Sequence, residues 1–348
     1  MESIGFRVSV KTRLRNLKNQ KTRKQSTIKL VTIKHMATFI EQHGDPQIPP
    51  PYSFPNVTIY SFRLTANENA LKELCNTRLN IGTREQRGFE YRPMLRRIVD
   101  FEVLHYPRMI SDNPRFNWGW TTQYECYFRI FVGRYDFRAG LWVPTEAAVF
   151  IPYIFVDNAW SVVSGREVIG FPKVMASFSL PNSETAKIGR LYPMRVVTDV
   201  FEQYSAKSYQ SACPIVEIDN SQAGPYIDEV PKEAIWPWGV FNPNNIDPAL
   251  LPFLRDRSKF SSVQLKQFRD AEQSELACYQ ALTHADVSID RIEFLKTLPA
   301  AEISIPRYDS LRIGQDLGLE GETLQPLWQY TVNCDLKYGK VRNLFVNT

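Results

Sequence analysis

From about residue 96 onward, apolar residues recur at every second position, and this period limits the fold more than any other feature of the sequence. Residues 98–104 and 123–132 alternate in this way, whereas 147–156 is apolar nearly throughout. Alternation predicts strands with two unlike faces, and a continuous apolar run fits a strand buried on both faces. Many strands and few helices predict one α+β domain, mainly antiparallel. Further strands are predicted at 57–64, 174–180, 194–201, 287–295, 301–305 and 327–336.

Other segments interrupt this pattern. Residues 67–75 predict a short helix with Asn67 as its N-cap, and 262–282 have a helical composition. Residues 107–118 are rich in turn formers. The Pro- and Asn-rich stretch 203–260 predicts an irregular insertion, such as a lid or an oligomer contact. We therefore expect a basic arm at 1–35, a Pro-rich linker at 36–56 and one domain at 57–348 that contains the insertion.

The net charge of +5 is distributed unevenly. Residues 1–35 hold ten of the 42 Lys and Arg residues and one of the 37 acids, which leaves 32 bases and 36 acids, or −4, for residues 36–348. A mildly acidic body argues against nucleic acid as a partner. The arm itself fits a disordered tail, an upstream extension with translation starting at Met36, or a transit-like peptide.

Several classes of protein and site have no support in the sequence. No run of roughly 18 apolar residues is present, so no membrane span is expected. The five cysteines are far apart and the four histidines lack metal-ligand spacing, which argues against a metal site and a disulfide framework. No nucleotide-binding motif or Ser-nucleophile elbow occurs. We expect a cytoplasmic protein without cofactor or metal.

The segment with most chemical information is Gly165–Lys173, with the sequence GREVIGFPK. Its lysine is bracketed by apolar residues and opens a predicted strand. A lone lysine is ordinarily a solvated surface charge. Apolar surroundings would instead disfavour an ammonium and make the amine more nucleophilic.

This segment resembles the active-site signature of the acetoacetate decarboxylase superfamily, whose lysine forms a Schiff base. The resemblance covers about residues 57–340 apart from 203–260. Residues 150–158 (FIPYIFVDN) are similar to the strand and turn that lead into the signature, and 278–305 to the closing strands. Residues 99–103 (VDFEV) resemble the strand with a catalytic glutamate, which implies Glu102. In TTQYE at 121–125, Gln123 or Glu125 would take the place of a second active-site glutamate.

The resemblance implies a closed β-barrel or cone with a few peripheral helices, acting as a homo-oligomer without a cofactor. Two departures concern the substrate. In acetoacetate decarboxylase a second lysine follows the Schiff-base lysine, where this chain has Val174. The position of an arginine linked to the second glutamate falls near Pro55. Both departures argue against acetoacetate as substrate but leave the Schiff-base lysine in place.

A Schiff-base lysine must first be neutral. An ordinary lysine, with a pKa of about 10.4, is free amine in only about one molecule in 2,500 at pH 7. Such lysines are activated by desolvation or by a cationic neighbour. With Val174 at the neighbouring position, this chain would rely on desolvation.

The other candidate residues keep structural alternatives. Glu102 faces solvent, or points into the cavity of a closed barrel and shuttles protons. Glu125 and Arg129 share a strand face, so Arg129 binds a substrate carboxylate, pairs with Glu125 or lies in solvent. Arg166 is a substrate-binding candidate that could equally brace its loop.

We therefore predict a lyase, most simply a decarboxylase, in which Lys173 forms a Schiff base with a keto acid or related carbonyl compound. Two rivals are an aldolase-dehydratase that uses the same lysine and a non-catalytic protein that binds a small molecule.

Overall fold

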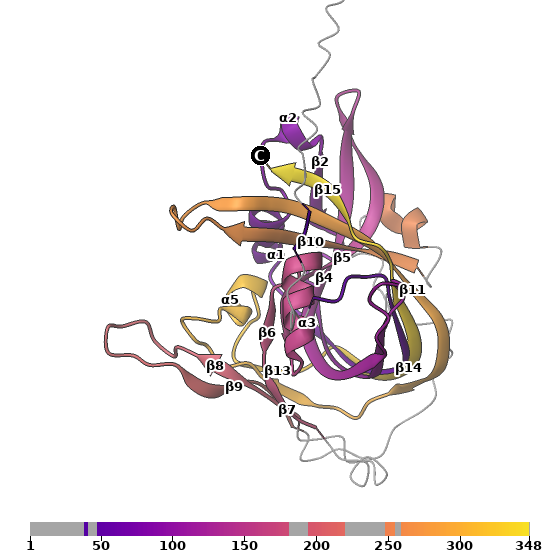
Figure 1. Ribbon diagram of the computed structural model, residues 1–348. Coiled ribbons are helices and arrows are strands. Elements are labelled where there is room, and N and C mark those ends of the chain that lie inside the picture. The colour runs from indigo at the N-terminus through magenta and orange to yellow at the C-terminus, as the bar shows by residue number, and fades with distance from the viewer. Residues whose placement is uncertain (1–37, 41–46, 181–193, 220–247, 255–258, 348) are drawn as a thin grey trace, which may run out of the picture. The chain divides into compact units, whose positions relative to one another are not determined.

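The computed structural model describes residues 38–40, 47–180, 194–219, 248–254 and 259–347. The chain separates into two units, residues 1–45 and 46–348. Of the first unit only residues 38–40 are described, and they lie in no helix or strand. All that follows concerns the second unit (Figure 1).

Strands dominate the described part of this unit, as the period of two predicts. The larger sheet contains β1 (Tyr52–Thr65), β2 (Phe89–Pro93), β3 (Ile98–Ser111), β4 (Trp120–Arg138), β5 (Leu141–Val156), β6 (Lys173–Met175), β10 (Lys259–Arg269), β11 (Ala277–Thr297), β14 (Trp328–Tyr338) and β15 (Arg342–Asn347). The smaller sheet contains β7 (Ser177–Ser179), β8 (Met194–Val200), β9 (Ser211–Asp219), β12 (Glu302–Ser304) and β13 (Thr323–Leu324).

The described helices are few and short. They are α1 (Glu68–Arg78), α2 (Arg84–Arg87), α3 (Ala159–Ser164), which continues as a π-helical turn (Gly165–Ile169), a 3₁₀ helix (Pro248–Leu254) and α5 (Ile313–Leu317). The predicted N-cap of α1 is confirmed, because the Asn67 side chain accepts hydrogen bonds from the backbone of Asn69 and Ala70. None of the described helices is long and apolar enough to span a membrane.

The strand pairings of the larger sheet close into a ring. The order is β2-β4-β3-β1-β14-β11-β10-β5-β6, and β4 also pairs with β5. The strands β4, β3, β1, β14, β11, β10 and β5 therefore form a closed ring of pairings, which surrounds the centre of Figure 1. Most pairings are antiparallel, but β10–β5 and β5–β6 are parallel, so the sheet is mixed.

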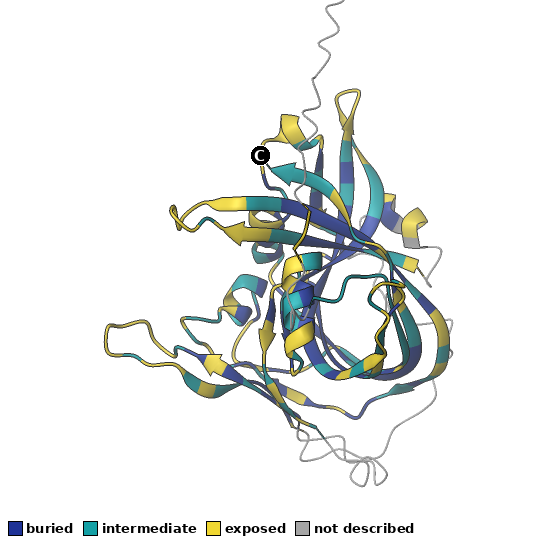
Figure 2. Cartoon of the chain, in the orientation of Figure 1, coloured by how far each residue is buried: buried dark blue, intermediate teal, exposed yellow. Residues whose placement is uncertain are grey.

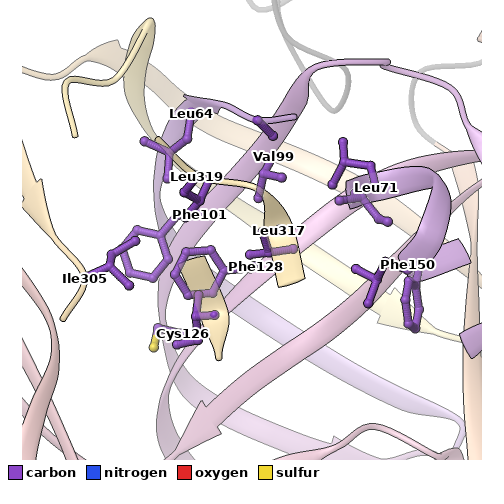
Figure 3. Close-up of a cluster of buried hydrophobic side chains, with 14 of the residues drawn as sticks. Leu64, Leu71, Val99, Phe101, Cys126, Phe128, Phe150, Ile305, Leu317 and Leu319 are labelled. Atoms are coloured by element: carbon purple, nitrogen blue, oxygen red, sulfur yellow. The ribbon is translucent and has the colours of Figure 1, made fainter. Parts of the chain in front are cut away.

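The ring has an apolar outer face and a partly polar inner face. Apolar side chains of β1, β3 and β4 pack outward against α1, α5 and the smaller sheet, as Figure 3 shows for Leu64, Phe101, Phe128 and Leu317. Because neighbouring residues of a strand point to opposite faces, the alternate residues of β3 and β4 point inward. The dark-blue strands in Figure 2 are accordingly buried on both faces. Burial on both faces allows polar side chains to be held inside the ring.

Several predicted boundaries and one predicted helix are wrong. Residues 262–282 form parts of β10 and β11 instead of a helix, because cross-strand pairing overrides their helical composition. β3 continues to Ser111, into the stretch predicted to be turns. β9 and the start of β10 lie within the insertion predicted to be irregular, of which 220–247 and 255–258 lie outside the described residues. β1 begins at Tyr52, inside the predicted linker.

Candidate active site

Lys173 is the first residue of β6 and is only 7% exposed. Its Nζ donates hydrogen bonds to Glu125 Oε2 and to Ser161 Oγ, both at 2.8 Å. The next residue, Val174, is 37% exposed, since it points to the other face of the strand. The predicted removal of Lys173 from solvent is therefore observed, and a carboxylate lies beside its amine.

Two glycines of the GREVIGFPK segment lie at close contacts that leave no space for a side chain. A Cβ on Gly165 would lie 2.6 Å from Lys173 Cδ, so a side chain at 165 would displace the lysine. Gly170 has a φ of +100°, and a Cβ there would lie 2.9 Å from the backbone of Lys266. The backbone N–H groups of Gly170 and Phe171 both donate to the Gly165 carbonyl and close the turn.

The helix before this turn is anchored to β4. The Asn158 side chain caps α3 and donates to Thr121 Oγ1 at 2.8 Å and to the Thr122 carbonyl at 2.9 Å. Asp157 Oδ1 accepts the backbone N–H of Tyr124 at 2.8 Å. The Asp-Asn turn thus fixes α3, and with it Ser161, relative to the strand that carries Glu125.

Strand register explains why Lys173 meets Glu125. Lys173 lies opposite Ile154 of β5, which lies opposite Tyr127 of β4. Glu125 precedes Tyr127 by two residues and shares its face. The Glu125 carboxylate also accepts Gln123 Nε2 at 2.7 Å and the Tyr106 hydroxyl at 3.1 Å. This cluster of Lys173, Glu125, Gln123, Tyr106 and Ser161 is called the lysine cluster below.

The lysine cluster lines a cavity of about 460 Å³. Volumes of roughly 300–1,000 Å³ are typical of small-molecule sites. Aromatic and aliphatic side chains form most of the described wall, including Phe54, Ile151, Ile154, Phe171 and Phe260. The cavity combines a polar cluster with apolar walls, which is the usual make-up of a ligand site.

A second buried polar cluster lies on the inner faces of β1, β3 and β4, and is called the arginine cluster below. Arg63 holds Asp100 through two hydrogen bonds of 2.8 and 2.9 Å. Arg129 Nη2 lies 3.2 Å from Asp100 and 2.8 Å from Glu102. The Tyr127 hydroxyl donates to Glu102 at 2.5 Å. Two guanidinium groups and two carboxylates therefore neutralise one another inside the ring.

The pKa values of the two buried carboxyl groups are shifted in opposite directions. Burial alone would raise the pKa of Asp100, but the charges and hydrogen bonds of Arg63 and Arg129 outweigh it and hold the pKa below its ordinary value. Burial raises the pKa of Glu102; Arg129 opposes this rise and Asp100 reinforces it. Asp100 is therefore the more firmly ionised of the two.

The structure brings some predicted site residues together and separates others. Lys173, Glu125 and Gln123 meet at the cavity, and the carboxylate that contacts the lysine is Glu125. Glu102 points into the ring and does not face solvent, yet it is not among the residues that line the cavity, whereas its partner Tyr127 is. Arg166 is exposed and donates to the Lys173 carbonyl at 3.2 Å, which agrees with loop bracing.

Arg129 lines the cavity, and the alternative that it lies in solvent is wrong, because it is buried. Its guanidinium pairs with Asp100 and Glu102 and is 3% exposed.

Sequence reasoning did not single out Arg63, Tyr106 and Ser161. Arg63 shares a strand face with Val57, Ile59 and Ser61 in the first predicted strand. A charged residue on this mostly apolar face was the signal that could have identified it. Tyr106 continues the Glu102 face of β3 beyond the end predicted for that strand. Ser161 lies in a helix that the sequence pattern did not indicate. Among the described residues, no three His, Cys, Asp or Glu side chains form a metal-binding group.

The fold and site define a mostly-strand protein with a lysine–carboxylate pair in an internal cavity. Residues 35–191 match the model of the acetoacetate decarboxylase (ADC) family. The match includes Lys173 and Glu125, so the resemblance inferred from the GREVIGFPK segment is confirmed. None of the curated proteins matches the chain.

Solved structures show the same fold. Acetoacetate decarboxylase from Legionella pneumophila subsp. pneumophila str. Philadelphia 1 is 14% identical with a TM-score of 0.53, and the match covers 88% of this chain and 97% of that one. An acetoacetate decarboxylase-like enzyme from Sphingomonas wittichii RW1 is 11% identical with a TM-score of 0.51, covering 88% and 98%. Another structure, described as acetoacetate decarboxylase, is 12% identical with a TM-score of 0.50, covering 86% and 92%.

Proposed function

We propose that the protein is a lyase in which Lys173 forms a Schiff base with a keto acid or related carbonyl compound, and that it acts as a decarboxylase. The observation that carries the proposal is the buried Lys173 Nζ, 2.8 Å from Glu125 and from Ser161, at the wall of a cavity of about 460 Å³. The match of residues 35–191 to the acetoacetate decarboxylase family model supports it.

In the proposed reaction Glu125 accepts a proton from Lys173, and the free amine attacks the substrate carbonyl. The addition product takes up a proton and loses water to form an iminium ion. When the substrate is a β-keto acid, the bond between its α-carbon and the carboxylate then breaks, CO₂ leaves, and the iminium accepts the electron pair to become an enamine. Protonation of the enamine and hydrolysis release the ketone and restore the lysine.

Glu125 takes the proton-transfer role first expected of Glu102, because Glu125 contacts the amine directly. In this proposal Glu102 acts through the hydroxyl of Tyr127, which lines the cavity and donates to it. Ser161 and Gln123 hold the lysine–carboxylate pair in position. Arg166 braces the loop from outside.

A second candidate reaction, aldol addition with dehydration, uses the same iminium. It is favoured by the charges around the cavity. The cationic side chains among the described lining residues are Lys173, Arg129 and Lys337, and each is paired with a carboxylate. A substrate carboxylate would have to compete with Glu125, Asp100 or Asp290 for its cation, whereas a neutral ketone or aldehyde would not.

Further parts of the proposal rest on the resemblance and on sequence composition. We propose that the ring of paired strands is the closed barrel of this family and that the protein works as a homo-oligomer. Schiff-base chemistry needs no cofactor or metal, and the acidic body gives no reason to expect a nucleic-acid partner. We propose a cytoplasmic location and no membrane partner.

Borohydride trapping tests the proposal. The protein is incubated with a panel of keto acids and ketones, reduced, digested and analysed by mass spectrometry, while CO₂ release is followed in parallel. We expect a reduced adduct on Lys173 that Lys173→Met abolishes. Lys266→Gln is the matched control, since Lys266 is half-buried beside the same loop but does not line this cavity. No adduct with any compound, together with no CO₂ release, would favour the non-catalytic binding protein.

A further inference from the structure

The cavity runs from a buried polar end to an exposed aromatic rim. Lys173 and Ile154 are 7% and 1% exposed, whereas Trp118, Trp120 and Trp160, which line the same cavity, are 63%, 58% and 43% exposed. The reacting amine therefore lies at the inner end and the tryptophans lie where the cavity opens. A molecule that extends from Lys173 to this opening would contact these rings.

The polar end provides one further anchor for the reacting group. Gln123 is 2% exposed and lines the cavity, and its Oε1 has no hydrogen-bond partner among the described residues. Its Nε2 donates to Glu125, so Oε1 is left as an acceptor. The hydroxyl group formed when an amine adds to a carbonyl is a donor that fits this acceptor. Gln123 would thus hold the carbonyl carbon at the inner end, beside Lys173.

The rest of the cavity is too large and too apolar for a small keto acid. Acetoacetate has two polar groups and a single methyl group, and would leave the wall formed by Ile151, Ile154 and Phe171 in contact with water. Apolar surface in contact with water is unfavourable, and each buried methylene contributes about a fourfold gain in binding, which corresponds to about 0.8 kcal/mol. The unused wall therefore indicates what the remainder of the substrate is made of.

We propose that the substrate carries an alkyl or aryl tail, which extends from the carbonyl at Lys173 along the apolar walls to Trp118 and Trp120. This inference rests on the proposed function for the position of the carbonyl. It specifies the substrate class as carbonyl compounds with an extended apolar substituent, as opposed to acetoacetate-sized acids.

A chain-length series tests the tail. Methyl ketones from 2-butanone to 2-decanone are trapped with borohydride, and the concentration that gives half-maximal labelling of Lys173 is measured. We expect it to fall about fourfold per methylene at first and about a hundredfold or more over the series. Trp120→Ala, which changes an exposed side chain, should weaken labelling by 2-decanone more than labelling by 2-butanone. Ile151→Trp narrows the cavity at its inner wall. It should lower the ratio of labelling by 2-decanone to labelling by 2-butanone further.

The two proposals fail in different ways. If both ketones label Lys173 at equal concentrations, the Schiff base stands and the tail is refuted. If neither labels it, the Schiff-base proposal fails, and calorimetry with Lys173→Met still tests the tail, because that variant binds ketones without covalent chemistry. A preference of about a hundredfold for 2-decanone in that variant would support the tail, and equal binding of the two ketones would overturn it.

Discussion

The ring of strands encloses two buried charged clusters that differ in how completely they are paired. In the arginine cluster, Arg63 and Arg129 share Asp100 and Arg129 also meets Glu102, so each charge is balanced within the protein. In the lysine cluster, Lys173 and Glu125 form one pair that faces a cavity of about 460 Å³. The clusters share β3 and β4, only a few residues apart along the strands.

This difference separates a structural role from a chemical one. Removing one member of a fully buried ion pair leaves a charge that water cannot reach, so the main effect is on stability. A lysine at a cavity can exchange its carboxylate partner for a substrate, so the main effect is on chemistry. The two clusters should therefore respond in opposite ways to matched substitutions.

The largest contrast is expected between Glu125→Gln and Glu102→Gln. Glu125→Gln should slow Schiff-base formation by about 10²–10⁴-fold, because the amine loses its proton acceptor. Glu102→Gln should slow it far less, since Glu102 reaches the cavity through Tyr127. Single-turnover borohydride trapping with one ketone measures both rates. Equal losses in the two variants would contradict the assignment of proton transfer to Glu125.

A large effect on stability is expected for Asp100→Asn. This change leaves Arg63 and Arg129 buried beside a neutral amide and should lower the free energy of unfolding by about 3–5 kcal/mol. Asp136→Asn in the same sheet is the matched control. Asp136 also contacts two arginines, Arg134 and Arg138, but it lies nearer the surface. There we expect less than about 1 kcal/mol. Urea unfolding followed by circular dichroism measures both, and similar losses would argue against a special role for burial.

The same two clusters show how much of the site can be predicted from the sequence. That Asp100 shares a strand face with Glu102, and Glu125 with Arg129, follows from alternation along single strands, which is a local property. Which of them meet depends on register between strands distant in sequence, such as Arg63 opposite Asp100. Single-sequence patterns carry no direct record of that register, so the pairing of Arg129 with Asp100 and Glu102 could not be read from spacing.

Local composition also misled where pairing decides the structure. Residues 262–282 are rich in Gln, Leu and Ala, which suits a helix, yet β10 and β11 pair along most of this stretch. The parallel neighbours of β5 are likewise a property of the assembled sheet. The glycines of the GREVIGFPK segment are the opposite case, since Gly165 and Gly170 are needed by close contacts within and beside one short loop.

A smaller effect, with opposite signs for the two carboxyl groups, is expected in the pH dependence of stability. Because the folded-state pKa of Asp100 is lowered, its contribution is present above the unfolded value of about 3.9 and is lost as the pH falls through the lower, folded value. Because the folded-state pKa of Glu102 is raised, the folded state takes up this proton first. Stability from Glu102 therefore rises as the pH falls through the folded value toward about 4.3.

Urea unfolding between pH 7 and pH 3 measures these contributions as differences between wild type and variant. For Glu102→Gln the difference should shift in favour of wild type as the pH falls from 7 toward about 4.3. For Asp100→Asn it should stay constant over that window and shrink below about pH 3.9. Parallel curves for the two variants would contradict the opposite directions of the pKa changes.

The smallest effect is expected at the N-terminus, where two truncations separate the basic arm from the residues that touch the cavity. Removing residues 1–35 should leave trapping at Lys173 unchanged, because the proposed chemistry uses no residue of the arm. Removing residues 1–51 should weaken it, since Ile48 lines the cavity and its N–H donates to Ser164 Oγ at 2.8 Å. Ser164 directly precedes Gly165, which leaves room for the Lys173 side chain. Pro49 and Pro51 also accept hydrogen bonds from Ser111 and Asp112, each typically contributing about 1 kcal/mol.

Trapping rates for the two truncations, compared with their unfolding in urea, test this division. A loss of labelling on removal of residues 1–35 alone would show that the arm takes part in the function, and equal activity of both truncations would show that the contact with Ser164 is dispensable.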